Sequence, residues 1–143
     1  MIIKGEHLTL KPLTDIDYLL KLSKEYAKEE FYGKIDNYEN NFWEIYFNRI
    51  RHGVIGYFKI EKLYILEAFK DRDIPSVGLK YSIEAGNLLL DYMSGFTDKV
   101  ITGARVKDRA IQVLCIKLGF REIQRVNEYN DNLIIYQKDM LCH

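Results

Sequence analysis

The sequence predicts a mixed α/β fold built around one sheet, and three observations carry this prediction. Short apolar stretches of strand character alternate with longer stretches of helical spacing along the 143 residues. Three strand-like stretches follow one another between residues 43 and 69, which favours an antiparallel meander. The chain has only two prolines and no run rich in serine or glycine. We therefore expect a single domain over residues 1–143 without an internal linker.

The N-terminal part is predicted to contain one strand and one clear helix. Leu8 and Leu10 alternate with polar residues, and Pro12 ends this strand at about Lys11. Thr14 can cap the helix that follows, because its hydroxyl accepts a bond from a free amide of the first turn. Apolar residues then recur at helical spacing as far as about Lys28. A short helix or turn is expected over residues 32–41.

The central part is predicted to form three consecutive strands. Apolar residues alternate with Glu44, Tyr46 and Asn48 after residue 43, although a helix over residues 43–51 is the competing interpretation. His52-Gly53 has the character of a turn. The second and third strands are then expected at Val54–Ile60 and Leu63–Phe69.

The C-terminal part alternates between helices and strands. Pro75 and Ser76 suit the entry to a helix that ends near Gly95, with Ser76 as its cap. A strand follows at residues 99–106. Asp108 can cap a helix over residues 109–118, and Gly119 suits its C-terminal end. Residues 121–126 and 133–138 are expected to form a closing hairpin, so the predicted order is β-α-α-β-β-β-α-β-α-β-β.

Composition excludes several classes of protein. Lys plus Arg and Asp plus Glu both number 21, so zero net charge gives no electrostatic sign of a nucleic-acid or membrane partner. Cys115 and Cys142 lack metal-ligand spacing, and we expect no metal site. No stretch is apolar and long enough for a signal peptide or a membrane span. A cytoplasmic protein is expected.

Three segments together resemble the GCN5-related N-acetyltransferases along the whole chain. Residues 4–13 look like the first strand of the ribosomal-protein acetyltransferase branch, and residues 52–57 are similar to a turn and strand of the family. The most specific segment is Lys117-Leu118-Gly119-Phe120, which looks like the end of the family's last helix. The order of predicted elements agrees with this resemblance. It implies the acyl-CoA N-acyltransferase fold.

The resemblance also implies a function and a set of binding residues. It implies an acetyl-CoA-dependent transfer of an acetyl group to a small-molecule or protein amine, by direct attack in a ternary complex. The pantetheine arm would pair with the backbone of Glu67, Ala68 and Phe69, in the gap between the strands at 63–69 and 99–106. The residues implied to face the pyrophosphate are Arg72, Ser76, Val77 and Gly78. Asp108 would contact the cofactor arm, unless its role is that of a helix cap. A homodimer is a common default.

The stretch at residues 72–79 departs from the phosphate loop of this family, which usually reads Gln/Arg-x-x-Gly-x-Gly/Ala. Gly78 is the one glycine and comes late, Asp73 adds a negative charge, and Pro75 removes an N–H donor. Lys70, Arg72 and Lys80 could supply positive charge. The alternative is a non-catalytic binding or structural module of the same fold, for example a phage-encoded protein with an eroded cofactor loop.

Glu67 is the candidate general base, because it is the only acid in the strand at residues 63–69. The competing interpretation is a solvent-facing residue on a half-exposed strand. His52 is the second candidate for a base. Cys115 occupies the position at which many family members carry a tyrosine that protonates the leaving thiolate. A buried, structural cysteine is the favoured interpretation there.

Overall fold

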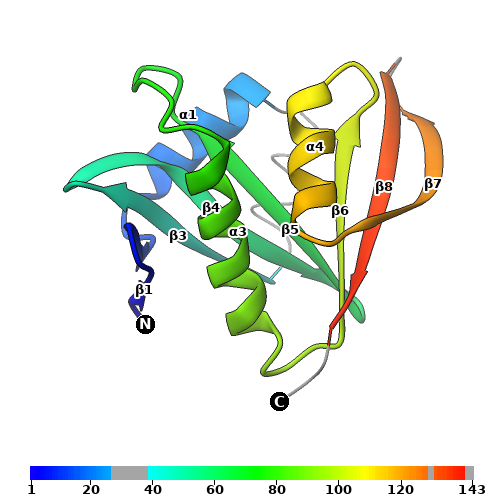
Figure 1. Ribbon diagram of the computed structural model, residues 1–143, viewed down its shortest axis with the longest axis horizontal. Coiled ribbons are helices and arrows are strands. Elements are labelled where there is room, and N and C mark those ends of the chain that lie inside the picture. Colours follow the sequence, from blue (N-terminus) through cyan, green and yellow to red (C-terminus); the bar gives the residue numbers. More distant parts are fainter. Residues whose placement is uncertain (27–38, 129–130, 141–143) are drawn as a thin grey trace.

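The computed structural model describes residues 1–26, 39–128 and 131–140. Within them the chain forms one eight-stranded sheet and three helices (Figure 1). The strands are β1 (Ile3–Lys4), β2 (Leu8–Pro12), β3 (Glu39–Phe47), β4 (Ile50–Ile60), β5 (Leu63–Lys70), β6 (Lys99–Arg105), β7 (Arg121–Glu128) and β8 (Asp131–Asp139). The helices are α1 (Ile16–Tyr26), α3 (Leu79–Met93) and α4 (Arg109–Lys117).

The sheet is mixed, as predicted. Its strand order is β1-β2-β3-β4-β5-β6-β8-β7. Neighbouring strands are antiparallel throughout, except that β5 and β6 run parallel. Helix α3 forms the connection between these two parallel strands. The sheet therefore consists of an antiparallel N-terminal half and an antiparallel C-terminal half, joined at a single parallel pair.

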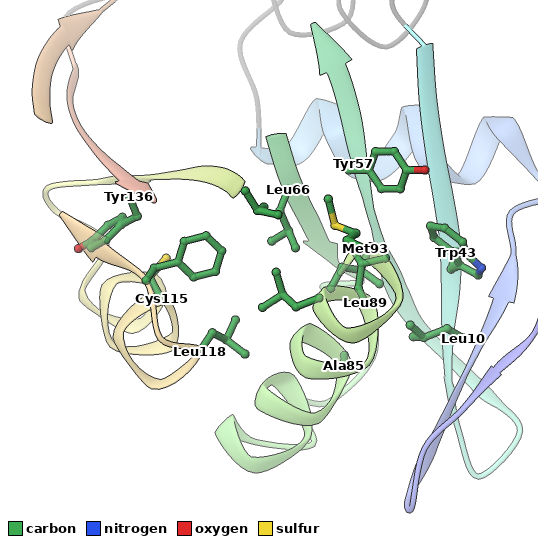
Figure 2. Close-up of a cluster of buried hydrophobic side chains, with 14 of the residues drawn as sticks. Leu10, Trp43, Tyr57, Leu66, Ala85, Leu89, Met93, Cys115, Leu118 and Tyr136 are labelled. Carbon is green, nitrogen blue, oxygen red and sulfur yellow. The ribbon is translucent and has the colours of Figure 1, made fainter. Parts of the chain in front are cut away.

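Each face of the sheet has its own apolar cluster, because successive strand side chains point to opposite faces. Helix α1 covers one face, where Leu19 and Leu22 pack with Phe58 and Phe69. Helices α3 and α4 cover the other face (Figure 1). Figure 2 shows this larger cluster, whose labelled members are Leu10, Trp43, Tyr57, Leu66, Ala85, Leu89, Met93, Cys115, Leu118 and Tyr136.

The predicted meander is confirmed, and the competing helix over residues 43–51 is wrong. The turn lies at Asn48 and Arg49, whose φ angles are 49° and 65°, and the prediction of a turn at His52-Gly53 is wrong. His52 instead lies in a bulge of β4, because Ile45 pairs with Gly53 while the next residue pairs with Arg51. Strand β4 therefore begins four residues earlier than expected.

Three further differences concern the N-terminal part of the chain. A short strand, β1, pairs with β2 and was not predicted as a separate element. The helix or turn predicted over residues 32–41 lies mostly outside the described residues, and its last three residues belong to β3. The described helix α1 agrees with the predicted one as far as Tyr26. Its cap differs from the prediction, since Oδ1 of Asp15, and not the Thr14 hydroxyl, accepts a bond from the Tyr18 amide, at 3.1 Å.

The helix ends in the C-terminal part are set by local chemistry. Asp108 caps α4 as predicted, because its Oδ1 accepts a bond from the Ile111 amide at 3.2 Å. Gly119, with φ of 91°, ends that helix, and the Phe120 amide donates to the Cys115 carbonyl at 3.0 Å. Helix α3 differs from the prediction, since its N-cap is Gly78 and not Ser76.

None of the helices in the described residues is both long and apolar enough to cross a membrane.

Candidate functional site

The two parallel strands β5 and β6 separate soon after they meet. They pair at a single register position, Ile65 with Ile101, although both strands continue for several residues beyond it. Just past this position the Thr102 hydroxyl donates to the Leu66 carbonyl at 2.9 Å, and both side chains are buried. We call the region beyond this bond the parting of β5 and β6; the two strands diverge there in Figure 1.

The backbone of β5 directs alternate residues toward the parting. The Leu66 carbonyl points toward β6, where it accepts the Thr102 hydroxyl. The Asp71 amide points the other way and donates to the His52 carbonyl beside β4, at 2.9 Å. Since polar backbone groups alternate along a regular strand, the N–H and C=O of Ala68 are directed toward the parting. Ala68 is also exposed.

The N-termini of α3 and α4 both lie at the edge of the sheet where β5 and β6 end (Figure 1). This follows from the parallel direction of the two strands, because the segments leaving their carboxyl ends start from the same edge. The first N–H groups of a helix lack partners within the helix, and the helix dipole is positive there. The edge above the parting therefore combines two electropositive helix ends.

The predicted phosphate-binding residues lie in the loop between β5 and α3. Arg72, Ser76 and Gly78 are exposed, and Val77 is half-buried. The Ser76 hydroxyl accepts a bond from the Gly78 amide at 3.2 Å, so it shapes the loop and does not cap the helix. Gly78 has φ of 98°, a conformation that favours glycine, and an added Cβ there would meet no atom within 4 Å.

Asp73 does not leave an uncompensated charge in this loop. Its carboxylate forms an exposed ion pair with Lys21 of α1, at 3.0 Å. The sequence-based expectation of a bare negative charge among the phosphate-binding residues is therefore corrected. The side chain is directed toward α1.

Glu67 is half-buried near the end of β5. Its neighbours at i−2 and i+2, Ile65 and Phe69, pack in the cluster under α1, so the Glu67 side chain points to the same face. Phe69 is 4% exposed and belongs to the core, so its side chain is not available to a ligand. His52 lies on the opposite face, where its ring packs edge-on against Phe47 at 5.9 Å. Glu67 and His52 thus do not act on the same side of the sheet.

Cys115 has the surroundings of a structural residue. It is 4% exposed and packs in the cluster under α3 and α4 (Figure 2). Burial raises the pKa of its thiol to about 11, and the charges of Glu67 and Asp108 act in the same direction. The favoured interpretation of a buried cysteine is confirmed.

Cys115 is expected to be unreactive toward thiol reagents in the native protein at pH 8, because a thiol with a pKa of about 11 is almost fully protonated there. A Cys142→Ser variant leaves Cys115 as the single thiol. Addition of Ellman's reagent to this variant should give no rapid reaction until guanidinium unfolds it. Rapid labelling of the folded protein would contradict this prediction.

Sequence reasoning missed two elements of the site. Thr102 was not singled out, although a hydroxyl directly after the apolar pair Val100-Ile101, in the middle of a predicted strand, was a usable signal. Gln112 was also missed; its amide donates to the carbonyls of Arg105 and Val106, at 3.0 and 2.6 Å, and thereby holds the end of β6 on α4. None of these three bonds can be deduced from spacing alone.

A separate open hollow of about 260 Å³ lies beside α4, where the helix meets Tyr136 of β8. Its lining residues are Arg109, Gln112, Val113, Ile116, Lys117 and Tyr136. We place the candidate site at the parting and not in this hollow, because the backbone groups and helix N-termini converge at the parting. Among residues 1–26, 39–128 and 131–140, no group of three or more His, Cys, Asp or Glu side chains is arranged to hold a metal ion.

The sequence matches no protein-family model and no curated protein. The fold, in contrast, is similar to those of several solved acetyltransferases. One is a ribosomal L7/L12 alpha-N-protein acetyltransferase in complex with coenzyme A, with a TM-score of 0.75, 15% identity and full coverage of both chains. Another is an acetyltransferase from Salmonella typhimurium that modifies the N-terminal serine of the same ribosomal protein. Its TM-score is 0.72, its identity 15%, and the match covers 98% of this chain and 99% of that one.

A third similar structure is the dodecameric spermidine N-acetyltransferase from Vibrio cholerae. Its TM-score is 0.75 at 16% identity, with 94% of this chain and 95% of that chain covered. At such low identity these similarities establish the fold alone. The predicted fold class is confirmed on this basis.

Proposed function

The chain has the fold of the GCN5-related N-acetyltransferases, and from this premise we propose that it is an acetyl-CoA-dependent N-acetyltransferase. The observation that carries the proposal is the parting of β5 and β6, toward which the Ala68 backbone is directed. An extended amide-containing arm can pair with such a strand as an added strand does. The pantetheine arm of coenzyme A is a ligand of this kind.

The residues around the parting fit the cosubstrate's charged end as well. The pyrophosphate would lie at the N-terminus of α3, where Gly78 opens the first turn. Lys70, Arg72 and Lys80 are exposed around this point and can supply positive charge. Pro75 lies earlier in the loop and takes no donor from the first turn of α3. We therefore keep Ala68, Arg72, Ser76, Val77, Gly78 and Asp108 as the proposed cofactor-binding residues. Phe69 is not among them, because its side chain lies in the core and its backbone is directed toward β4.

The acceptor amine would approach from the face of the sheet covered by α1. Glu67 lies on that face at the parting, where its carboxylate can accept a proton from the amine directly or through water. Bound acetyl-CoA supplies the activated thioester carbonyl. Backbone N–H groups at the parting are suited to stabilise the oxygen that becomes negative as the amine attacks. As the C–N bond forms, the C–S bond of the thioester would break, and coenzyme A would leave as a thiolate that takes a proton from water. Transfer would then be direct, within a ternary complex.

The acceptor is proposed at the level of a chemical class. The structurally similar enzymes act on a ribosomal protein and on spermidine, and both substrates present an amine. A small-molecule or protein amine is accordingly the proposed acceptor.

Acetyl-CoA is expected to raise the free energy of unfolding. A ligand present at 100 times its dissociation constant stabilises the folded protein by ~2.7 kcal/mol. Chemical denaturation would be followed with and without millimolar acetyl-CoA, with inorganic pyrophosphate at the same ionic strength as the control. Stabilisation by acetyl-CoA well beyond that by pyrophosphate is the expected result. Absence of any stabilisation would overturn the proposal and favour a non-catalytic module of the same fold.

A further inference from the structure

A buried hydrogen bond ties helix α1 to the start of the loop between β5 and α3. The Tyr18 hydroxyl donates to Oδ2 of Asp71 at 2.9 Å. Tyr18 is 5% exposed and Asp71 is 8% exposed. Buried polar groups of this kind are costly unless both partners are satisfied, so the bond fixes two elements that are 53 residues apart in sequence.

Asp71 organises the first turn of this loop with both its side chain and its backbone. Its Oδ1 accepts a bond from the Asp73 amide at 3.0 Å, which forms an Asx turn. Its carbonyl accepts from the Ile74 amide at 3.3 Å, and its own amide donates to the His52 carbonyl at 2.9 Å. The loop thus obtains its turn from an aspartate side chain, in a stretch where Gly78 is the one glycine.

Tyr18 is also held in place by Arg51, which packs on the face of its ring. The Arg51 guanidinium lies over the ring, with its central carbon 3.4 Å from the ring centroid. Arg51 in turn donates to the buried Glu44 carboxylate at 2.7 Å and to Asp15 at 3.3 Å. Burial, together with the bond to Asp71, raises the pKa of the Tyr18 hydroxyl, so this hydroxyl stays protonated and remains a donor.

We propose that Tyr18 is a positioning residue for cosubstrate binding: its bond to Asp71 fixes the β5–α3 loop so that the N-terminus of α3 faces the parting. The proposal deepens the proposed function and rests on it for the identity of the ligand. The bond lies on the α1 face, close to the acceptor side, whereas the loop serves the cosubstrate. Helix α1 would therefore set the geometry of both halves of the site.

A second contact between helix α1 and the β5–α3 loop is expected to contribute less stability. Lys21 and Asp73 form an ion pair at 3.0 Å, but their side chains are 54% and 71% exposed. Exposed ion pairs contribute little because water and salt screen them. Removal of the Lys21 side chain should therefore leave the loop in place, and the positioning is assigned to Tyr18.

The test compares Tyr18→Phe with a matched removal of a hydroxyl from the same helix. Ser23→Ala is the control, because the buried Ser23 hydroxyl bonds only the Leu20 carbonyl of its own helix in the described residues. Hydrogen exchange at the amides of Asp71, Asp73 and Ile74 reports on the loop without any ligand. We expect Tyr18→Phe to speed this exchange about tenfold, and Ser23→Ala and Lys21→Ala to leave it unchanged.

The second measurement is the affinity for acetyl-CoA and the split between KM and kcat. Tyr18→Phe should raise the dissociation constant and KM for acetyl-CoA about tenfold with little change in kcat. Asp71→Asn, which keeps the size of the side chain, should act in the same direction if Tyr18→Phe fails to fold. Unchanged loop exchange in both variants would overturn the inference. Failure of the wild-type protein to bind acetyl-CoA would overturn the proposed function, while the exchange data would still decide whether Tyr18 holds the loop.

Discussion

Replacement of Glu84 by alanine is expected to destabilise the protein by about 3 kcal/mol, since the side chain holds the turn between β1 and β2 on α3. The Glu84 carboxylate accepts bonds from the amides of His7 and Leu8, both at 2.9 Å, and from Nδ1 of His7 at 2.8 Å. Its side chain is 18% exposed, so these bonds are only partly screened by water. Alanine would leave two partly buried N–H groups without an acceptor.

The close approach of this turn to α3 supports the size of the effect. A Cβ built on Gly5 would lie 2.6 Å from Oε2 of Glu84 and 2.7 Å from Cδ1 of Leu88, so the backbone touches the helix where glycine allows it. Helix α3 also packs Tyr81 against the His7 ring, at 5.4 Å between centroids. Loss of Glu84 would thus loosen the N-terminal strands from the helix as a unit.

Equilibrium denaturation of Glu84→Ala and of Glu6→Ala would measure this effect. Glu6 is the matched control, because it lies in the same turn but its side chain is 84% exposed and 3.8 Å from the His7 ring. A loss in Glu84→Ala no larger than that in Glu6→Ala would contradict the prediction.

The contribution of Glu84 should also depend on pH. Burial raises the pKa of its carboxyl, but the bonds from the His7 amide and ring and the Leu8 amide outweigh burial and lower it below its ordinary value. Its stabilising contribution is therefore present above the unfolded-state pKa of about 4.3 and is lost as pH falls through the lower folded-state value. Glu84→Ala should accordingly lose less stability than the wild type between pH 5 and pH 3.

Local patterns were sufficient to predict most elements of the fold. The alternation in β3 and the helical spacing in α3 and α4 have a single physical cause, burial of one face, and this cause acts between near neighbours. The cap at Asp108 and the end of α4 at Gly119 were predicted for the same reason, since each bond spans only a few residues. The turn at Asn48-Arg49 was missed because non-glycine residues adopt positive φ there.

The site was predicted less completely, because its decisive contacts connect distant residues. The bonds from Tyr18 to Asp71 and from Thr102 to Leu66 span 53 and 36 residues. In the sequence, Asp73 looked unfavourable for phosphate binding because its ion-pair partner, Lys21, lies on another element. The glycine pattern of a phosphate loop contains no information about such contacts, and in this stretch the Asp71 side chain supplies the first turn.

Glu67→Gln is expected to reduce kcat by about 100-fold to 10,000-fold, the range for loss of a general base. Glutamine keeps the size and polarity of the side chain but cannot accept the amine proton at neutral pH. The affinity for acetyl-CoA should stay unchanged, because the Glu67 side chain lies on the α1 face while the Ala68 backbone is directed toward the parting. Release of coenzyme A would be followed with spermidine and with short peptides that carry a free N-terminus.

Asp139→Asn is the matched control for this experiment, because Asp139 is a strand carboxylate that is 60% exposed, pairs with Arg121 and lies on β8, away from β5. It should retain the wild-type kcat. If Glu67 acts as a base, it must be deprotonated, so the wild-type rate should fall at low pH with the form of a single ionisation. The pH–rate profile of Glu67→Gln should lack this fall. If the Glu67→Gln variant catalysed the reaction at the wild-type rate and with the same pH profile, the proton of the attacking amine would have to pass to water alone. The positive helix ends and the backbone at the parting would then account for catalysis without a side-chain base.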